Sequence, residues 1–263
     1  MKLACQESMA PGKTLAEKMD NLAAAGYEGI ELGGSGLCDR VDEVKKAAAG
    51  HPVKPCSICS GFRGSPMDTD KKERDKASED MHRLLEVAGE LTMSGLIMVP
   101  IFGGPKIADL SPYMTAVQLE KELFVRQCQE WAETAIKAGT VLLIEPLNRY
   151  ETHLIRKLSD GVEICERVNS PGVKIMADFF HMSIEERDIP ASIRSAGSHI
   201  AHVHLADSTR ELPGYGHTDF RSGFAALKEA GYTGYMALEC GIPGSDRQAE
   251  LKKSADYMRG LMQ

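Results

Sequence analysis

Short apolar segments alternate with longer amphipathic segments along the whole chain, and this alternation limits the possible folds more than any other feature. Short apolar runs bounded by glycine or polar residues are typical of buried strands. The sequence predicts eight of them, at Lys2–Gln6, Gly29–Leu32, Val53–Cys59, Gly95–Ile101, Val141–Pro146, Val173–Asp178, Ile200–Ala206 and Gly234–Cys240.

The intervening segments have helical periodicity, as in "TLAEKMDNLAAAG", "KKERDKASEDMHRLLEVAGEL", "QLEKELFVRQCQEWAETAIKAG", "SDGVEICERVN" and the last one, "DRQAELKKSADYMRGLM". Strands separated by helices imply right-handed crossovers and a parallel sheet. Eight such units in 263 residues fit one (β/α)₈ TIM barrel spanning residues 1–263. The alternative, a doubly wound open sheet, would carry a glycine-rich turn after its first strand. Here "LGGSG" follows the second strand and has a different spacing.

Composition narrows the functional classes. The formal net charge is −7 and the pI is about 5.7, which argues against general affinity for nucleic acid. The segment "MKLACQESMAPGK" does not have the apolar core of a signal peptide, and no apolar run is long enough to span a membrane. Seven scattered cysteines fit free thiols in a reducing compartment. We therefore expect a cytoplasmic protein.

Four consecutive strands carry a possible metal ligand at or near their C-terminal ends. "VLLIEP" contains Glu145, "VKIMAD" ends in Asp178, "HIAHVHLADS" contains His204, and "GYMALEC" contains Glu239. Burying an unpaired carboxylate is costly, so a cation or a reaction should account for each of them. Barrel strands lie ~4.8 Å apart, and inward side chains near the rim face the axis. The four residues can therefore converge on one point.

Any one of these residues alone would more often be a paired loop residue or a buried core residue, and the same holds for His202. Their recurrence in four successive strands favours a shared site. Three carboxylates and one imidazole favour Mn²⁺, Mg²⁺ or Co²⁺ over a metal bound by thiolates. Cys56 and Cys59 have the spacing of a metal or redox pair, but no second pair follows, so a closed zinc site is not expected.

Further polar residues lie just beyond these strands, and they are Glu151, His153, His181, Arg210, His217 and Asp219. For Glu151, His153 and His217 a solvated loop is an equally good interpretation. We expect His181 and Arg210 to lie closer to the proposed metal and therefore to belong to the site.

Several of these segments resemble one known family. "IEPLNRYETH", "ADFFHMSIEERDIP", "HVHLADSTRELPGYGHTDF" and "YMALE" resemble the xylose-isomerase-like barrel superfamily of sugar phosphate isomerases and epimerases. Within it they are most similar to ketose 3-epimerases of the D-tagatose and D-psicose (allulose) type. "GYEGIEL" is also family-like, and the resemblance is densest from Val141 to Glu239.

The resemblance implies roles for particular residues. One divalent metal, usually Mn²⁺, would be bound by Glu145, Asp178, His204 and Glu239. Glu145 and Glu239 would also be the catalytic acid/base pair. The residues that match positions holding substrate oxygens are Glu151, His181 and Arg210. The implied reaction is C3 epimerisation of a ketose through a metal-stabilised enediolate. The family also implies a homo-oligomer, either a dimer or a tetramer.

This set of residues is chemically consistent with that reaction. The proton next to a ketone is weakly acidic, and a metal on the neighbouring oxygens would polarise them as a Lewis acid. One glutamate could take the proton from one face of the enediolate while the other returns a proton to the opposite face. Arg210 would support the developing negative charge.

Other functions remain open at this point. The same groups could serve an inosose or hydroxypyruvate isomerase, an inosose dehydratase or a 3-keto-sugar lyase. A phosphorylated substrate would need cations at the rim, for which Arg63, Lys106 and Arg210 are available. A phosphodiesterase resembling apurinic endonucleases is less favoured, because "GIELGG" and "CSICSG" contain no histidine. A sugar-binding barrel without activity would not need two acid/base carboxylates.

Overall fold

The computed structural model describes residues 1–262, and within them eight parallel strands pair in chain order. The barrel closes because the last strand also pairs with the first, with Cys5 opposite Leu238. The strands are β1 (Lys2–Gln6), β2 (Gly29–Gly33), β3 (Lys54–Cys59), β4 (Leu96–Met98), β5 (Leu142–Ile144), β6 (Val173–Asp178), β7 (Ile200–Leu205) and β8 (Tyr235–Leu238). The predicted TIM barrel is confirmed, and the open-sheet alternative is wrong.

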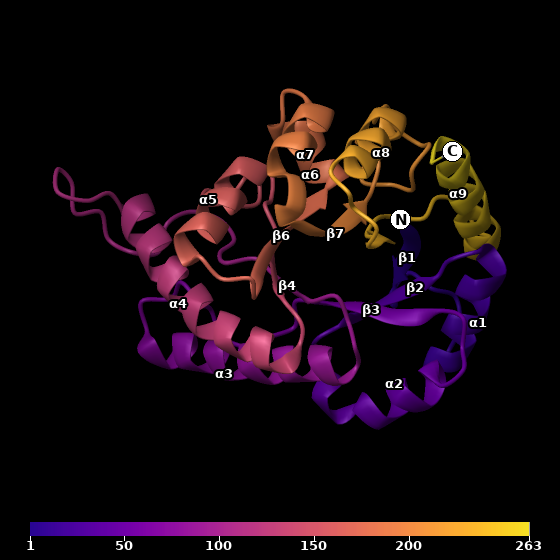
Figure 1. The fold of residues 1–263 in the computed structure, drawn as a ribbon, viewed down its shortest axis with the longest axis horizontal. Helices are drawn as coiled ribbons and strands as arrows, with labels where there is room; N and C mark the ends of the chain where they lie inside the picture. The colour runs from indigo at the N-terminus through magenta and orange to yellow at the C-terminus, as the bar shows by residue number, and fades with distance from the viewer. Residues whose placement is uncertain (263) are drawn as a thin grey trace.

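Helices cover the outside of the barrel (Figure 1). They are α1 (Leu15–Ala25), α2 (Val41–Ala48), α3 (Lys71–Glu90), α4 (Ala116–Ala138), α5 (Leu158–Val168), α6 (Phe179–Glu185), α7 (Ile189–Ala196), α8 (Phe220–Glu229) and α9 (Arg247–Leu261), with short 3₁₀ turns η1 (Leu37–Asp39) and η2 (Gly197–His199). The long segment between β4 and α4 projects beyond the barrel, at the left of Figure 1.

Local sequence signals set the ends of the long helices. Thr14 and Glu17 form a capping box at the start of α1, and Thr115 and Gln118 form another at the start of α4. Each box satisfies backbone N–H groups that have no partner within the helix. Helix α4 ends at Gly139, whose φ of 73° is left-handed and therefore suits glycine.

Three strands are clearly shorter than predicted, and one of them is Gly234–Cys240, which forms a strand only over Tyr235–Leu238. Gly95–Ile101 forms a strand only over Leu96–Met98, and Val141–Pro146 only over Leu142–Ile144. Pro100 and Pro146 have no backbone N–H to donate to a neighbouring strand, so pairing stops before them. The apolar residues beyond β4 and β5 are nevertheless buried, which is why composition alone overestimated the strand lengths.

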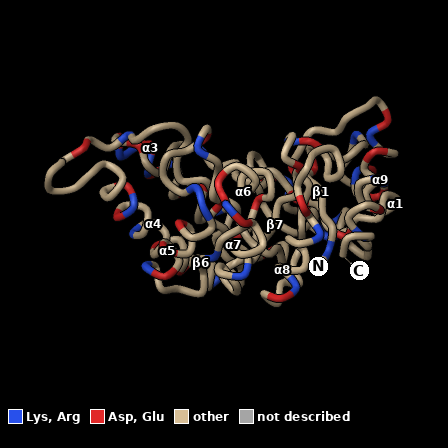
Figure 2. The backbone as a smooth tube through the Cα atoms, turned by 90° about the horizontal axis from the view of Figure 1, so that it is seen from above, with Lys and Arg blue, Asp and Glu red and all other residues tan. Residues whose placement is uncertain are grey.

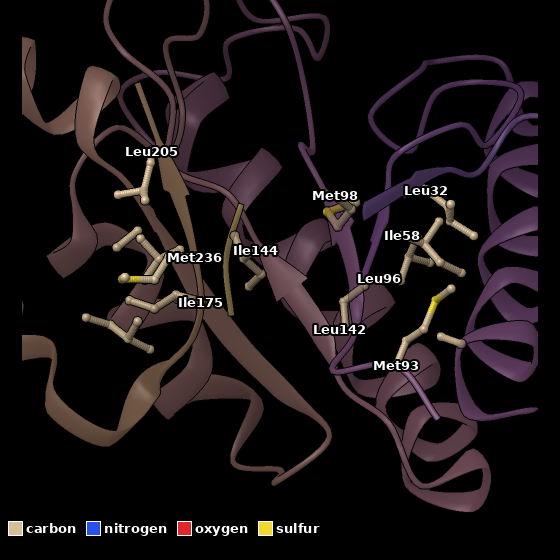
Figure 3. Close-up of a cluster of buried hydrophobic side chains, with 14 of the residues drawn as sticks. Leu32, Ile58, Met93, Leu96, Met98, Leu142, Ile144, Ile175, Leu205 and Met236 are labelled. Atoms are coloured by element: carbon tan, nitrogen blue, oxygen red, sulfur yellow. The ribbon is translucent and has the colours of Figure 1, made fainter. Parts of the chain in front are cut away.

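Alternation along the strands separates two apolar layers. Leu96, Met98, Leu142 and Ile144 belong to the large core between strands and helices, part of which is drawn in Figure 3. The intervening residues form a smaller cluster inside the barrel, which contains Ile97, Leu143 and Met176. Since side chains two positions apart share a face, Glu145 and Asp178 have the inward orientation of Leu143 and Met176.

Charged residues of both signs are interspersed over the outer helices, as Figure 2 shows. Across residues 1–262, none of the helices combines the length and the apolar composition that crossing a membrane requires.

Candidate metal centre and active site

Four inward side chains meet at the C-terminal rim of the barrel. One ligand atom from each lies within 4.8 Å of the others, and these residues, here called the outer cluster, are Glu145, Asp178, His204 and Glu239. The strand register explains the meeting, because β7 pairs His204 with Asp178 on one side and with Ala237, two residues before Glu239, on the other. The outer cluster is therefore built by four consecutive strands, β5 to β8.

His204 lies at the centre of the outer cluster. Its Nδ1 is 3.6 Å from Glu145 Oε1, 3.8 Å from Asp178 Oδ2 and 3.4 Å from Glu239 Oε2. Its Nε2 is 2.9 Å from a carboxylate oxygen of Glu31. A carboxylate can only accept, so Nε2 carries a proton, and in the neutral imidazole the lone pair of Nδ1 is directed at the three other carboxylates.

Two buried atoms of the outer cluster are unpaired. Among the described residues 1–262, neither Glu145 Oε1 nor His204 Nδ1 has a hydrogen-bond partner. Buried polar atoms are normally paired, so an unpaired oxygen and an unpaired nitrogen facing each other call for a ligand. Three carboxylates and one imidazole lone pair are the donor set of a divalent cation that prefers oxygen. The residues present therefore fit a metal ion.

The electrostatics of the outer cluster agree with that fit. Burial raises the pKa of the Glu145 carboxyl to about 7, and the neighbouring carboxylates add to the shift. Burial also disfavours a charged Glu239, but the positive charges of His204 and Arg210 prevail and lower its pKa to about 2. The pKa of His204 is well above its ordinary value, because the attraction of Glu31 and Glu239 exceeds the effect of burial. The three carboxylates thus favour a positive charge at Nδ1, which is either a proton on this atom or a cation that takes the place of the proton.

Arg210 approaches the outer cluster from the loop after β7. Its Nη1 lies 3.0 Å from Asp178 Oδ2, its other terminal nitrogen donates to Glu239, and its guanidinium stacks on Phe180. Its φ of 59° is in the left-handed region, which is unfavourable for a residue with a side chain. The buried carboxylate of Asp207 accepts backbone N–H groups of Ser208, Gly214 and Thr218 and so organises this loop. Local strain that a loop maintains in this way is common at functional sites.

His181 has a defined tautomer. Backbone and side-chain N–H groups of Asn148 donate to its Nδ1, at 3.2 Å and 2.8 Å. Its Nε2 therefore carries the proton, and it lies 3.7 Å from Asp178 Oδ2 and 3.9 Å from Glu145 Oε1. Asn148 also donates to Glu151, so one amide links two of the three predicted substrate-binding residues, Glu151 and His181. Asp178 caps α6 by accepting from the Phe180 and His181 N–H groups, so His181 is held in the first turn of a helix.

Beneath the outer cluster lies a second buried polar group, here called the inner network, consisting of Glu31, Ser57 and His202. Ser57 donates to Glu31 Oε2 at 2.7 Å, and His202 Nε2 lies 2.9 Å from the same oxygen. Gln6 Nε2 donates to both Glu31 and Glu239, at 3.1 Å and 2.9 Å. His204 Nε2 lies within hydrogen-bond distance of Glu31 Oε1, so both carboxylate oxygens of Glu31 have hydrogen-bond partners.

Three predicted polar residues lie elsewhere. His153 contacts the buried carboxylate of Glu120 in α4 and the backbone carbonyl of Gly103, and so joins the segment after β5 to α4 and to the segment after β4. Asp219 caps α8, and His217 is in the exposed part of the loop after β7. These three residues hold loops in place rather than joining the outer cluster.

Four further residues contact the site and were not predicted from the sequence, namely Glu31, Ser57, Asn148 and Gln6. Glu31 had a usable signal, because it is a carboxylate inside the apolar run "GIEL", just as Glu145 follows "VLLI". Gln6, Ser57 and Asn148 belong to residue types that occur throughout protein structures, so only their contacts distinguish them.

Comparison with known proteins agrees with the geometry. Residues 19–261 match the family model described as "Xylose isomerase-like TIM barrel". The 3-dehydro-D-guloside 4-epimerase of Escherichia coli strain K12 is 28% identical over 261 residues, which cover 98% of this chain and 99% of that protein. The L-ribulose 3-epimerase of Mesorhizobium japonicum is 32% identical over 182 residues, covering 67% of this chain and 59% of that protein.

Solved structures give the same result for the fold. The apo form of the 3-keto-D-glucoside 4-epimerase from E. coli matches with a TM-score of 0.90 at 27% identity, covering 99% of both chains. A D-psicose 3-epimerase with D-tagatose from Clostridium cellulolyticum H10 matches with a TM-score of 0.86 at 22% identity over the full length of both, a likeness of fold. The chain belongs to the xylose isomerase-like TIM barrel family.

Proposed function

We propose that this protein is a metal-dependent isomerase that epimerises a keto sugar at the carbon next to its ketone. The observation that carries the proposal is the pair of unpaired buried atoms on Glu145 and His204 inside a cluster of three carboxylates. Relatives named as 3- or 4-epimerases of keto sugars support it. Both reactions remove a proton next to a carbonyl, so one set of groups can perform either.

Glu145, Asp178, His204 and Glu239 would hold one divalent cation, for which Mn²⁺ is our first choice and Mg²⁺ or Co²⁺ the alternatives. When bound, this cation would supply Lewis-acid polarisation of the substrate's carbonyl and neighbouring hydroxyl oxygens. Asp178 would serve only as a metal ligand and not in proton transfer, because its other carboxylate oxygen caps α6.

Glu145 and Glu239 would carry the proton. They project from the ends of β5 and β8, with two strands between them, and so approach a sugar in the centre from different sides. In one direction Glu239 takes the proton from carbon and leaves a planar enediolate, and Glu145 returns a proton to the opposite face. The two exchange roles in the reverse direction.

The remaining polar groups would orient the substrate. The Nε2–H of His181 and the guanidinium of Arg210 are donors at the edge of the outer cluster, suited to sugar oxygens and to negative charge that develops on them. Glu151, which is bound to Asn148, would accept from a hydroxyl. Removing these groups should raise KM and lower kcat without abolishing metal binding.

Two substrate classes fit this chemistry. The first is a free ketose epimerised at C3, as the sequence resemblance implies. The second is a 3-keto hexoside epimerised at C4, and the full-length match to a 3-dehydro-D-guloside 4-epimerase favours it. An isomerase, dehydratase or lyase acting on a related keto compound would use the same groups.

Seven free cysteines fit the predicted cytoplasmic location. The homo-oligomer stays a prediction.

The test is proton NMR in D₂O with Mn²⁺-loaded and metal-stripped protein against ketoses, keto-inositols and 3-keto hexosides, with Mn²⁺ removed before spectra are recorded. Metal-dependent deuterium uptake beside the ketone, together with the epimer, would support the proposal and identify the class. Uptake with isomerisation or elimination would move the protein to another branch of the same chemistry. Uptake from none of the compounds would refute the proposal.

A further inference from the structure

A polar cavity of about 500 Å³ opens beside the outer cluster, over the C-terminal ends of β1, β2 and β3. Glu239 lies in the wall of this cavity as well as in the outer cluster, so the two spaces are continuous. The other wall residues include Glu7, Ser8, Lys18, Gly33, Ser35 and Arg40. Since the cavity has the size of a small-molecule site, a ligand at Glu239 has room to extend into it.

The wall is suited to hydroxyl groups. Glu7 accepts two hydrogen bonds from Arg40, at 2.9 Å and 3.1 Å, and lies 3.5 Å from Lys18. Ser8 and Ser35 add hydroxyls that can donate or accept. Every side chain named here is polar, apart from Gly33, which has none. Cys59 and other apolar atoms also contribute to the wall, so a sugar, which has both hydroxyl groups and C–H faces, fits the two kinds of surface.

The wall is also poorly suited to a phosphate. Both cations face Glu7, and Arg40 is further neutralised by Glu43, at 2.8 Å. A phosphate would have to compete with these carboxylates and would lie close to the negative charges of Glu7 and Glu239. A neutral group with many hydroxyls can use the same donors and acceptors without disrupting the pairs.

We propose that this cavity binds a neutral, hydroxyl-rich group linked to the reacting sugar, so that the preferred substrate is a keto glycoside carrying a second sugar unit. The inference rests on the proposed function and specifies its substrate class. A free ketose at the outer cluster would leave the cavity filled with water, whereas the second sugar of a glycoside would occupy it. The name of the full-length relative, a guloside epimerase, is consistent with a glycoside.

Gly33 provides a way to fill the cavity. A Cβ added there meets no atom within 4 Å, and its φ is not in the left-handed region, so Gly33→Leu adds bulk to the cavity without straining the backbone. Gly260, in α9, has the same two properties, which makes Gly260→Leu a matched control. Ser35→Leu fills the cavity from another wall position.

The experiment measures kcat/KM of the Mn²⁺-loaded protein for a disaccharide oxidised at C3 of its non-reducing sugar and for the corresponding methyl 3-keto hexoside. We expect the wild type to favour the disaccharide by about tenfold, mainly through KM, as one or two extra hydrogen bonds can provide. Gly33→Leu and Ser35→Leu should bring this ratio close to one, whereas Gly260→Leu should keep the wild-type ratio.

Equal kcat/KM values for the two compounds in the wild type would overturn the inference and leave the proposed function intact. A preference that survives both Gly33→Leu and Ser35→Leu would also overturn it, since the second sugar would then bind elsewhere. Absence of turnover with every keto sugar would overturn the proposed function, and the inference with it.

Discussion

The outer cluster and the inner network contain the same kinds of side chains at similar depth, yet they differ in how completely their carboxylate oxygens are paired. The difference does not extend to the imidazoles, because within residues 1–262 His202 Nδ1 has no hydrogen-bond partner either. In the inner network both oxygens of Glu31 are saturated by Gln6, Ser57 and two imidazoles. In the outer cluster Glu145 Oε1 and His204 Nδ1 face each other unpaired among residues 1–262. A saturated carboxylate indicates a supporting role, and an unpaired one indicates a place for a ligand.

His204 belongs to the outer cluster and contacts Glu31 of the inner network, so it connects the roles of the two groups. Its Nε2–H is held by Glu31, which fixes the tautomer and presents Nδ1 to the outer cluster. An imidazole held in this way is a better metal ligand, because its orientation is set and its basicity is raised by the carboxylate. We therefore regard Glu31 as a positioning residue that acts on the metal through His204.

The largest expected effect concerns the outer cluster. Glu239→Gln should keep the fold and much of the metal binding but lower kcat for proton exchange by about 10³-fold, because a neutral amide cannot take a proton from carbon. Deuterium uptake followed by NMR measures it, with exposed Glu86→Gln as the control. Full activity in Glu239→Gln would show that the mechanism with two carboxylates is wrong.

Metal binding should stabilise the folded protein. Mn²⁺ at a hundred times its Kd should add about 2.7 kcal/mol to the free energy of unfolding. For a chain of this size that raises Tm by about 5–10 °C, measurable by calorimetry. Asp178→Asn keeps the shape of the side chain but weakens one ligand, so its shift should be smaller. An equal shift in both proteins would place the cation elsewhere.

The inner network should affect the metal indirectly. Glu31→Gln replaces the carboxylate that holds His204 and should weaken Mn²⁺ binding by about 10- to 100-fold. Titration calorimetry measures the affinity, and circular dichroism checks that the fold persists. Unchanged affinity would mean that His204 needs no such support.

The smallest effect is expected at Ser57. Ser57→Ala removes one donor from Glu31, which still accepts from His202, His204 and Gln6. Stability should fall by about 1 kcal/mol, the typical worth of one hydrogen bond. Mn²⁺ affinity should change much less than in Glu31→Gln. A loss of affinity as large as in Glu31→Gln would instead make the whole inner network part of metal binding.

The barrel could be predicted because its signal is repeated in every strand–helix unit, so errors at single boundaries do not alter the topology. The outer cluster could be located by a local rule, a polar side chain at the inward end of an apolar strand. Glu31 obeys the same rule but lies in β2, away from the four consecutive strands that attracted attention. The contact of Glu31 with His204 depends on barrel closure, which places residues 173 positions apart side by side.

Features that depend on loop geometry could not be predicted. Asn148 is one amide among many in the sequence, and its importance arises from donating to both His181 and Glu151. The strained backbone of Arg210 is likewise set by contacts of the loop that carries it, not by the residue type. The cavity beside Glu239 combines residues from the ends of four strands, from α1 and from the loops after β1 and β2, so it exists only in the folded chain.

The assignment of the four metal ligands is tested most directly by anomalous diffraction from crystals of the protein grown with Mn²⁺. We expect one strong anomalous peak among Glu145, Asp178, His204 and Glu239, on the Nδ1 side of His204. A second group, formed by Glu31, Cys59 and His204, also has its ligand atoms within 4.8 Å of one another and offers a rival position on the Nε2 side. A peak there, or none at the outer cluster, would contradict the assignment of ligand and supporting roles.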